Sequence, residues 1–219
     1  MEQDMIIDHS DRRYMERREA LGANKHNGAY YYSREIVENI IPRVQTDRHW
    51  ITVNVRGAGV DHAIVFVHNN LHPENYEWLK TYGFRDLIMV CGIEETCEKV
   101  AHIGTPIYLP LSIDTAYVKQ FRTEKTKEIA YAGRKAKRKE YELPEGTEYL
   151  EEMPREIFLA ELAKYRTVYA VGRSAIEAKA LGCRLKAYDP RFPKVSRWKV
   201  LDNAAAAEIL QAKLDEIDG

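Results

Sequence analysis

The chain is organised around residues 168–190, which read VYAVGRSAIEAKALGCRLKAYDP. The segment opens on a short apolar run, and Gly172 can then turn the chain. Ser174 and Glu177 have the spacing of a capping box, which predicts a helix that begins at the serine. Gly182 can adopt the left-handed conformation that commonly ends a helix, and a second strand follows. Strand, tight turn, helix and strand together form a βαβ unit.

The start of this predicted helix can receive an anion. Residues 172–183, GRSAIEAKALGC, resemble the "EAmalG" segment in the C-terminal half of the two-Rossmann-domain (GT-B) glycosyltransferases. The resemblance implies that Glu177 holds the ribose of a nucleotide-sugar donor, with Arg173 and Ser174 facing its diphosphate. Many retaining members carry a second glutamate eight residues earlier, where this chain has Tyr169. The alternative is that Glu177 only completes a helix cap.

A basic run follows the predicted strand 128–132 and begins with Gly133 and Arg134. The family has "vGR" followed by a lysine, and these two cations hold the donor diphosphate. The resemblance therefore implies that the phosphates are bound by Gly133, Arg134 and either Lys137 or Arg138. Arginine offers a planar fork and lysine a point charge, and both suit phosphate oxygens. A solvated surface loop is the alternative.

In the first half of the chain, residues 63–67 form an unbroken apolar run, which is typical of a strand buried on both faces. His68 and Asn69 follow it directly, and open α/β sheets bind ligands beyond the carboxyl ends of their strands. His68 also resembles the histidine that many GT-B enzymes place near the donor sugar. We therefore predict His68 as a catalytic residue and Asn69 as a ligand contact, with a structural histidine as the alternative.

A glycine loop opens another predicted helix near the N-terminus, over residues 36–41. In the family, such a loop faces the cleft between the two domains. We therefore predict Gly28, Tyr30 and Ser33 as ligand contacts. An ordinary turn with a serine helix cap is the alternative.

Strands and helices alternate along the chain, which predicts an α/β fold of two small Rossmann-like halves around a cleft, a minimal GT-B-like arrangement. We expect an N-terminal, acceptor-side domain over 1–122 and a nucleotide-binding domain over 123–200. A C-terminal helix over 201–219 is expected to brace the N-terminal domain. The predicted strands are 50–55, 63–67, 86–91, 106–111, 128–132, 168–171 and 184–188.

Composition narrows the choice of partners. With 33 basic and 34 acidic residues, the chain has no bulk charge that would favour duplex nucleic acid. The cysteines Cys91, Cys97 and Cys183 are too few and scattered for a disulfide framework or a zinc site, so we expect reduced thiols in a cytoplasmic protein. No stretch approaches about 18 consecutive apolar residues, so we expect no membrane span.

Two functions from different classes follow. The first is a glycosyltransferase that moves a sugar from a nucleotide-diphosphate donor to an unknown acceptor. The second is a non-catalytic protein that sequesters a nucleotide-derived host defence signal, because compact chains of this kind resemble bacteriophage proteins. Both take a nucleotide-type small molecule as ligand, without a further cofactor. No metal is expected, since Asp-x-Asp is absent from the sequence. A homodimer and a host-cytoplasmic location are compatible with either function.

Overall fold

The computed structural model describes residues 34–51, 61–67, 72–133, 140–151 and 153–219. These residues divide into two compact units. The first combines 34–110 with the C-terminal segment 204–219, and the second covers 111–203.

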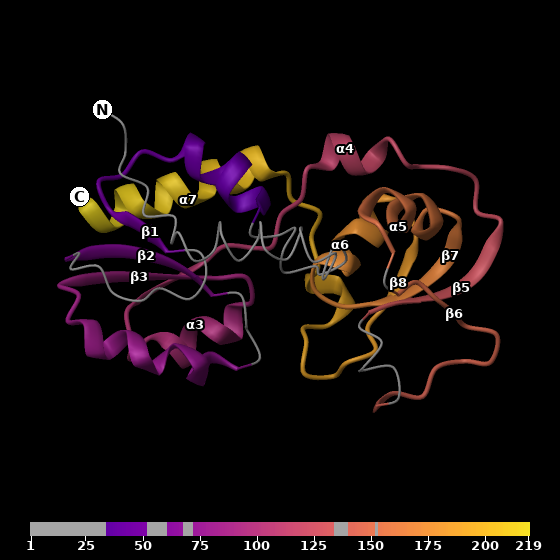
Figure 1. Ribbon diagram of the computed structural model, residues 1–219, viewed down its shortest axis with the longest axis horizontal. Coiled ribbons are helices and arrows are strands. Elements are labelled where there is room, and N and C mark those ends of the chain that lie inside the picture. Colours follow the sequence, from indigo (N-terminus) through magenta and orange to yellow (C-terminus); the bar gives the residue numbers. More distant parts are fainter. Residues whose placement is uncertain (1–33, 52–60, 68–71, 134–139, 152) are drawn as a thin grey trace. The chain divides into compact units, whose positions relative to one another are not determined.

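The first unit is built on a parallel four-stranded sheet in the order β1-β2-β3-β4. Its central strands are almost wholly buried, as the unbroken apolar runs predicted. Helix α3 covers one face of this sheet and helix α7 the other (Figure 1). The elements of this unit are η1 (Ile36–Ile40), η2 (Ile41–Arg43), β1 (His49–Ile51), β2 (His62–Val67), η3 (Pro73–Tyr82), β3 (Asp86–Cys91), α3 (Glu94–Val100), β4 (Thr105–Tyr108) and α7 (Asn203–Asp218).

Successive side chains along β2 and β3 point to opposite faces of the sheet, so they contribute to two separate cores, one on each face. Val65 and Met89 lie in the cluster that also holds Val100 of α3. Their sequence neighbours, such as Phe66, point to the opposite face, where Trp50 stacks on Phe66 with ring centroids 5.9 Å apart. Both faces of the sheet are therefore filled by apolar side chains, which is why its strands read as continuous apolar runs.

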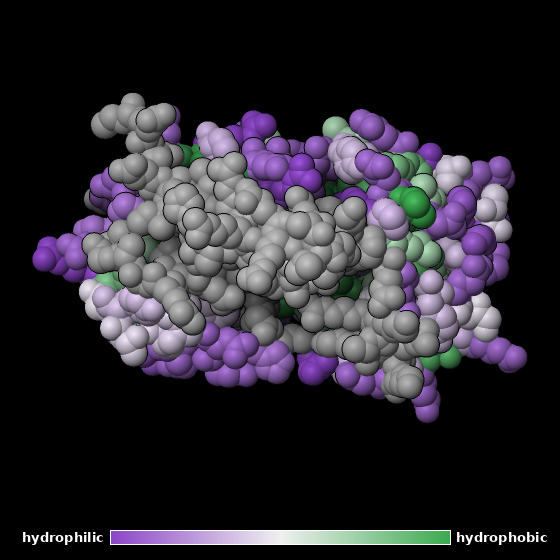
Figure 2. All heavy atoms as spheres, in the orientation of Figure 1, coloured by the Kyte–Doolittle hydropathy of each residue, from purple (hydrophilic) through white to green (hydrophobic). Residues whose placement is uncertain are grey.

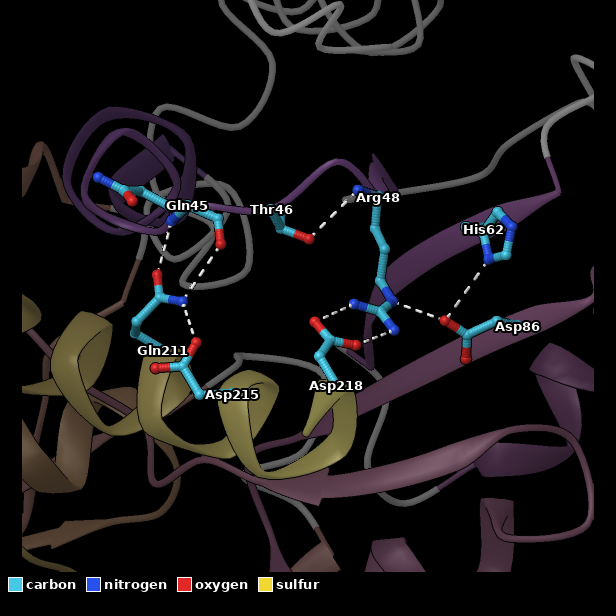
Figure 3. A network of polar contacts seen from close by, with 8 residues as sticks. All are labelled: Gln45, Thr46, Arg48, His62, Asp86, Gln211, Asp215 and Asp218. Carbon is cyan, nitrogen blue, oxygen red and sulfur yellow. Dashed lines mark hydrogen bonds and ion pairs between the residues drawn. The ribbon is translucent and has the colours of Figure 1, made fainter.

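A polar network at the amino-terminal edge of this sheet joins it to the end of α7 (Figure 3). Arg48 lies just before β1, and its side chain is only 9 % exposed. Its Nε donates to Asp86 at 2.6 Å, and its two terminal nitrogens donate to the two oxygens of Asp218 at 2.8 and 2.6 Å. The hydrogen bond from Arg48 lowers the pKa of Asp218. Arg48 thus connects the first strand with the last helix.

Replacing Arg48 by Met should therefore lower the free energy of unfolding by about 1.5 kcal/mol. The value lies below that for a fully buried pair, because Asp218 is 51 % exposed and is screened by water. The loss should shrink as the pH falls through the lowered pKa of Asp218, because that carboxylate is then protonated in both proteins. Urea denaturation measures this difference. Arg34→Met, which breaks an exposed pair with Glu38, is the matched control and should change little.

The second unit carries its own parallel four-stranded sheet, in the order β6-β5-β7-β8. The prediction of an α/β protein with two Rossmann-like parallel halves is thereby confirmed (Figure 1). Its core gathers Ala130, Val168, Ile176 and Leu185 from the strands and α6. The elements are α4 (Thr115–Lys119), β5 (Lys127–Ala132), β6 (Glu148–Tyr149), α5 (Arg155–Leu162), β7 (Tyr165–Ala170), α6 (Arg173–Ala180), β8 (Arg184–Lys186) and η5 (Val195–Arg197).

Hydrophilic side chains make up most of the described surface on the face shown in Figure 2. Among the described helices, none combines the length and apolar character that crossing a bilayer requires.

Candidate nucleotide-binding site

The second sheet reverses its strand order between β5 and β7. From β5 the chain passes to β6 on one side, whereas β7 pairs with β5 on the other. Ala132 and Ala170 lie opposite each other at the ends of these two strands. Open α/β sheets bind ligands outside the carboxyl ends of their strands at such a reversal. This edge is therefore the candidate ligand site of the second unit, and Gly133 and Gly172 lie there.

The turn from β7 into α6 differs from the predicted capping box. The helix begins at Arg173, two residues before a Ser174 N-cap would allow, and its N-cap is Gly172 without any side-chain cap bond. The prediction of a Ser174–Glu177 capping box is therefore wrong. The reason is that the chain already turns into the helix at Gly172. This residue adopts φ 63° and ψ −138°, a conformation that glycine can adopt but a residue with a side chain, such as serine, cannot.

Gly172 also has free space on the side where a side chain would lie, among the described residues. A Cβ built on this residue would meet no atom within 4 Å among the described residues. A ligand can approach the first amides of α6 closely at such a glycine, as phosphates do at other strand-to-helix turns. The other end of the helix agrees with the sequence. Gly182 has φ 80°, so the predicted left-handed stop is confirmed.

Glu177, the predicted ribose ligand, lies at the centre of an ion-pair cluster. Its side chain is only 1 % exposed. Its Oε1 accepts a hydrogen bond from Arg173 Nε at 2.7 Å and another from Arg155 Nη1 at 2.5 Å. Each arginine is the first residue of a helix that follows a strand, so both enter from the carboxyl edge of the sheet. Two guanidinium groups thus converge on one carboxylate oxygen at this edge of the sheet.

The arginine cluster explains the burial of Glu177 without a ligand. A buried carboxylate needs charged or hydrogen-bonding partners to offset its desolvation, and Glu177 has two. Sequence reasoning missed Arg155, which lies 22 positions earlier in the chain. The signal in the sequence was its place just after Pro154, because proline is common in the first turn of a helix.

Gly133, at the end of β5, is enclosed by tyrosine hydroxyls. A Cβ on this residue would lie 2.4 Å from Tyr131 Oη and 2.9 Å from Tyr188 Oη. The rings of Tyr131 and Tyr188 are 4.8 Å apart, and that of Tyr141 lies 5.0 Å from Tyr188. Burial is the main cause of the raised pKa of Tyr131, which keeps this phenol protonated. Gly133 therefore makes room for an aromatic cluster at the same sheet edge.

A buried aspartate fixes this aromatic cluster to the end of β8. Asp189 is fully buried and accepts hydrogen bonds from Arg191 Nη2 at 2.7 Å, Nε at 2.9 Å and backbone N at 3.1 Å. Arg191 also donates to Tyr141 Oη at 3.1 Å. Burial alone would raise the pKa of Asp189, but the hydrogen bonds from Arg191 and Tyr141 outweigh it and lower this pKa to about 2. Sequence reasoning did not single out Asp189.

The structure thus brings Gly133, Arg173, Ser174 and Glu177 to neighbouring strand ends and the helix that follows them. The other predicted site residues lie outside the described residues: Gly28, Tyr30, Ser33, His68, Asn69, Arg134, Lys137 and Arg138. Among the residues that the structure describes, no group of histidine, cysteine, aspartate and glutamate side chains could hold a metal ion.

The fold is that of an α/β protein whose second unit has the strand-order reversal at which Rossmann-like sheets bind ligands. Comparisons with known protein families, with curated proteins and with solved structures find no match to the chain.

Proposed function

We propose that the second unit binds the diphosphate of a nucleotide at the β5–β7 edge. The observation that carries this proposal is the start of α6 at the strand-order reversal, where Arg155 and Arg173 converge on Glu177 and a Cβ on Gly172 would meet no described atom within 4 Å. A helix start offers unpaired amides to an anion, and the charge of Arg155 and Arg173 adds attraction. Tyr141 and Tyr188 are partly exposed at this edge, and aromatic rings suit a nucleobase.

The activity that we propose is glycosyl transfer of the GT-B type, from a nucleotide-diphosphate donor to an acceptor. In such a reaction negative charge grows on the departing diphosphate as the bond to the sugar breaks. The amides of α6 and the arginine cluster would stabilise that charge in the transition state, and this is how an electrostatic site accelerates a reaction. The catalytic role of His68 stays a prediction from the sequence.

A non-catalytic nucleotide binder is the second candidate, and the surroundings of Glu177 favour it. The carboxylate that the GT-B resemblance assigns to the ribose is 1 % exposed and bonded to two arginines. Tyr169 also stands where many retaining members have a second glutamate. A site that keeps its phosphate-binding parts while its carboxylates serve other purposes would bind a nucleotide without turning it over.

Ser174→Glu tests the phosphate site without removing any part of the ion-pair cluster. Ser174 is the second residue of α6, whose first turn contains no acidic side chain. A glutamate there repels a bound phosphate, while it stabilises the helix through the macrodipole. We expect affinity for uridine or guanosine diphosphate to fall at least about tenfold, a typical scale for one charged contact, with thermal stability unchanged or higher. Isothermal titration calorimetry and a melting curve measure the two quantities.

Ser174→Gln is the matched control, since it has the same length without the charge. It should retain affinity within a few-fold. Equal affinity in the glutamate variant and the wild type would place the phosphates elsewhere and refute the proposed site.

Turnover separates the enzyme from the binder. The wild-type protein is incubated with common nucleotide-diphosphate sugars, and release of the nucleoside diphosphate is followed. Slow donor hydrolysis that Ser174→Glu abolishes would support the transferase. Nucleotide binding without release, together with an intact nucleotide found by mass spectrometry of the purified protein, would support the binder.

A further inference from the structure

A row of three tyrosines and a lysine crosses one face of the second sheet. Tyr131 of β5 is in register with Tyr149 of β6 on one side and with Tyr169 of β7 on the other. Tyr169 is in turn in register with Lys186 of β8. Side chains in register on parallel strands point to the same face of the sheet, so the row extends over all four strands.

The helices of the second unit pack on the opposite face. Ala130 and Val168, which alternate with the residues of the row, share a core cluster with side chains of α5 and α6. The tyrosines of the row lie outside that cluster. Tyr131 is buried, but Tyr149 is 43 % exposed and Tyr169 is partly exposed. Two aromatic rings on this face are therefore accessible to a ligand.

The exposed charge on this face is positive. Arg184 and Lys186 are both exposed, and Lys186 Nζ lies 5.6 Å from the ring centroid of Tyr169. None of the residues of β5, β6, β7 and β8 that point to this face is acidic. Glu151, just after β6, is half-buried, and Asp189, after β8, is fully buried. Aromatic rings and cations are thus combined on one surface of a chain whose total charge is nearly balanced.

We propose that this face of the second sheet binds a single-stranded nucleic acid. Its bases stack on Tyr149 and Tyr169, and its phosphates pair with Lys186 and Arg184. Such a surface accepts a strand of any sequence, because every base has a π face, whereas a double helix keeps its base faces stacked. Neighbouring strands of a sheet lie about 4.8 Å apart, so Tyr149 and Tyr169 are separated by about 10 Å and each can take its own base.

The positive charge decides between a nucleic acid and a neutral carbohydrate. A sugar ring can also pack on a tyrosine, but it gains nothing from Lys186 and Arg184. A polyanion gains from both, and its binding releases counterions. The surface consists of residues other than Gly172 and the arginines at the starts of α5 and α6, so this proposal does not depend on the nucleotide site proposed above.

Fluorescence anisotropy of labelled oligothymidylate and oligouridylate, titrated with the full-length protein, tests the proposal. The wild type should bind at least one of them, with an affinity that falls as salt rises. Tyr149→Ala should lower this affinity about tenfold, a typical scale for the loss of one stacked base. Tyr149→Phe keeps the ring and should retain affinity within a few-fold. Lys186→Gln should weaken binding and reduce the slope of log affinity against log salt by about 0.7.

Two matched controls lie away from this face. Tyr82→Ala removes a tyrosine of similar exposure (39 %) from the first unit, and Arg166→Gln removes an exposed cation from the opposite face of β7. Both should retain affinity within a few-fold. An excess of uridine diphosphate should not displace the oligonucleotide.

Four results would overturn the proposal. The first is a wild type that binds neither oligonucleotide at low salt. The second is binding that Tyr149→Ala and Lys186→Gln leave unchanged. The third is displacement by uridine diphosphate, which would place the strand in the nucleotide site instead. The fourth is salt-independent binding of a neutral oligosaccharide that Tyr149→Ala abolishes, without binding of nucleic acid, which would assign the face to carbohydrate.

Discussion

Glu177→Gln should lower the free energy of unfolding of the second unit by about 3 kcal/mol, the largest effect that we expect of any single substitution in this chain. The substitution removes the carboxylate charge that accepts hydrogen bonds from both Arg155 and Arg173 in a buried site. The effect lies at the low end for a broken buried pair, because Arg155 is 13 % exposed and the glutamine oxygen can still accept a hydrogen bond. Urea denaturation measures it.

The same variant separates a structural role of Glu177 from a ribose contact. A capping-box glutamate would be replaced by glutamine at almost no cost, so an unchanged stability would contradict the ion-pair role. Inorganic pyrophosphate, which has no ribose, should bind the variant at least as well as the wild type, because a negative charge has been removed near the site. A loss of affinity confined to the nucleoside diphosphate would instead assign Glu177 to the ribose. Arg155→Met is the control that leaves Glu177 paired with Arg173.

Asp189→Asn should cost about 2 kcal/mol of stability at neutral pH, and the cost should vanish in acid. The pKa of Asp189 falls from an ordinary value near 3.8 to about 2 on folding, which corresponds to about that free energy. Because the folded-state pKa is the lower one, this stabilisation is complete above pH 3.8 and is lost as the pH falls toward 2. The difference in unfolding free energy between wild type and variant should therefore shrink over this window.

Paired urea titrations at neutral pH and near pH 3 measure this dependence. Glu128→Gln, which breaks an exposed pair with Arg166, should show no comparable dependence and is the matched control. A difference between wild type and Asp189→Asn that stays constant down to pH 2 would show that Asp189 is held by packing rather than by its charge.

Much of the fold was readable from local patterns. The apolar runs at 63–67 and 86–91 predicted the central strands β2 and β3, because a strand covered on both faces has no polar side to alternate with. The left-handed glycine Gly182 ended α6 as predicted. The parallel, alternating α/β class also followed from the order of elements. Each of these features depends on the chemistry of neighbouring residues, which is what a sequence records directly.

Local spacing was misleading at the start of α6. Ser174 and Glu177 satisfy a capping-box pattern, yet the helix begins at Arg173 and Glu177 bonds instead to two arginines. The pattern identified the helix correctly but not its first residue. The turn with positive φ at Gly172 places the start of the helix earlier than the pattern predicted. The buried carboxylate of Glu177 accepts charge-assisted hydrogen bonds from two arginines, which are stronger than a hydrogen bond from a backbone amide.

The sequence by itself determined the two parallel sheets, the turns and the place of α6 after β7. Only the tertiary structure decided which charges meet. Pairing of β7 with β5 set the strand-order reversal. Folding also brought Arg155 to Glu177 across 22 positions and Arg48 to Asp218 across 170. The reason is physical: burying a charge requires an opposite partner, and strand order rather than spacing along the chain selects which partner lies within reach.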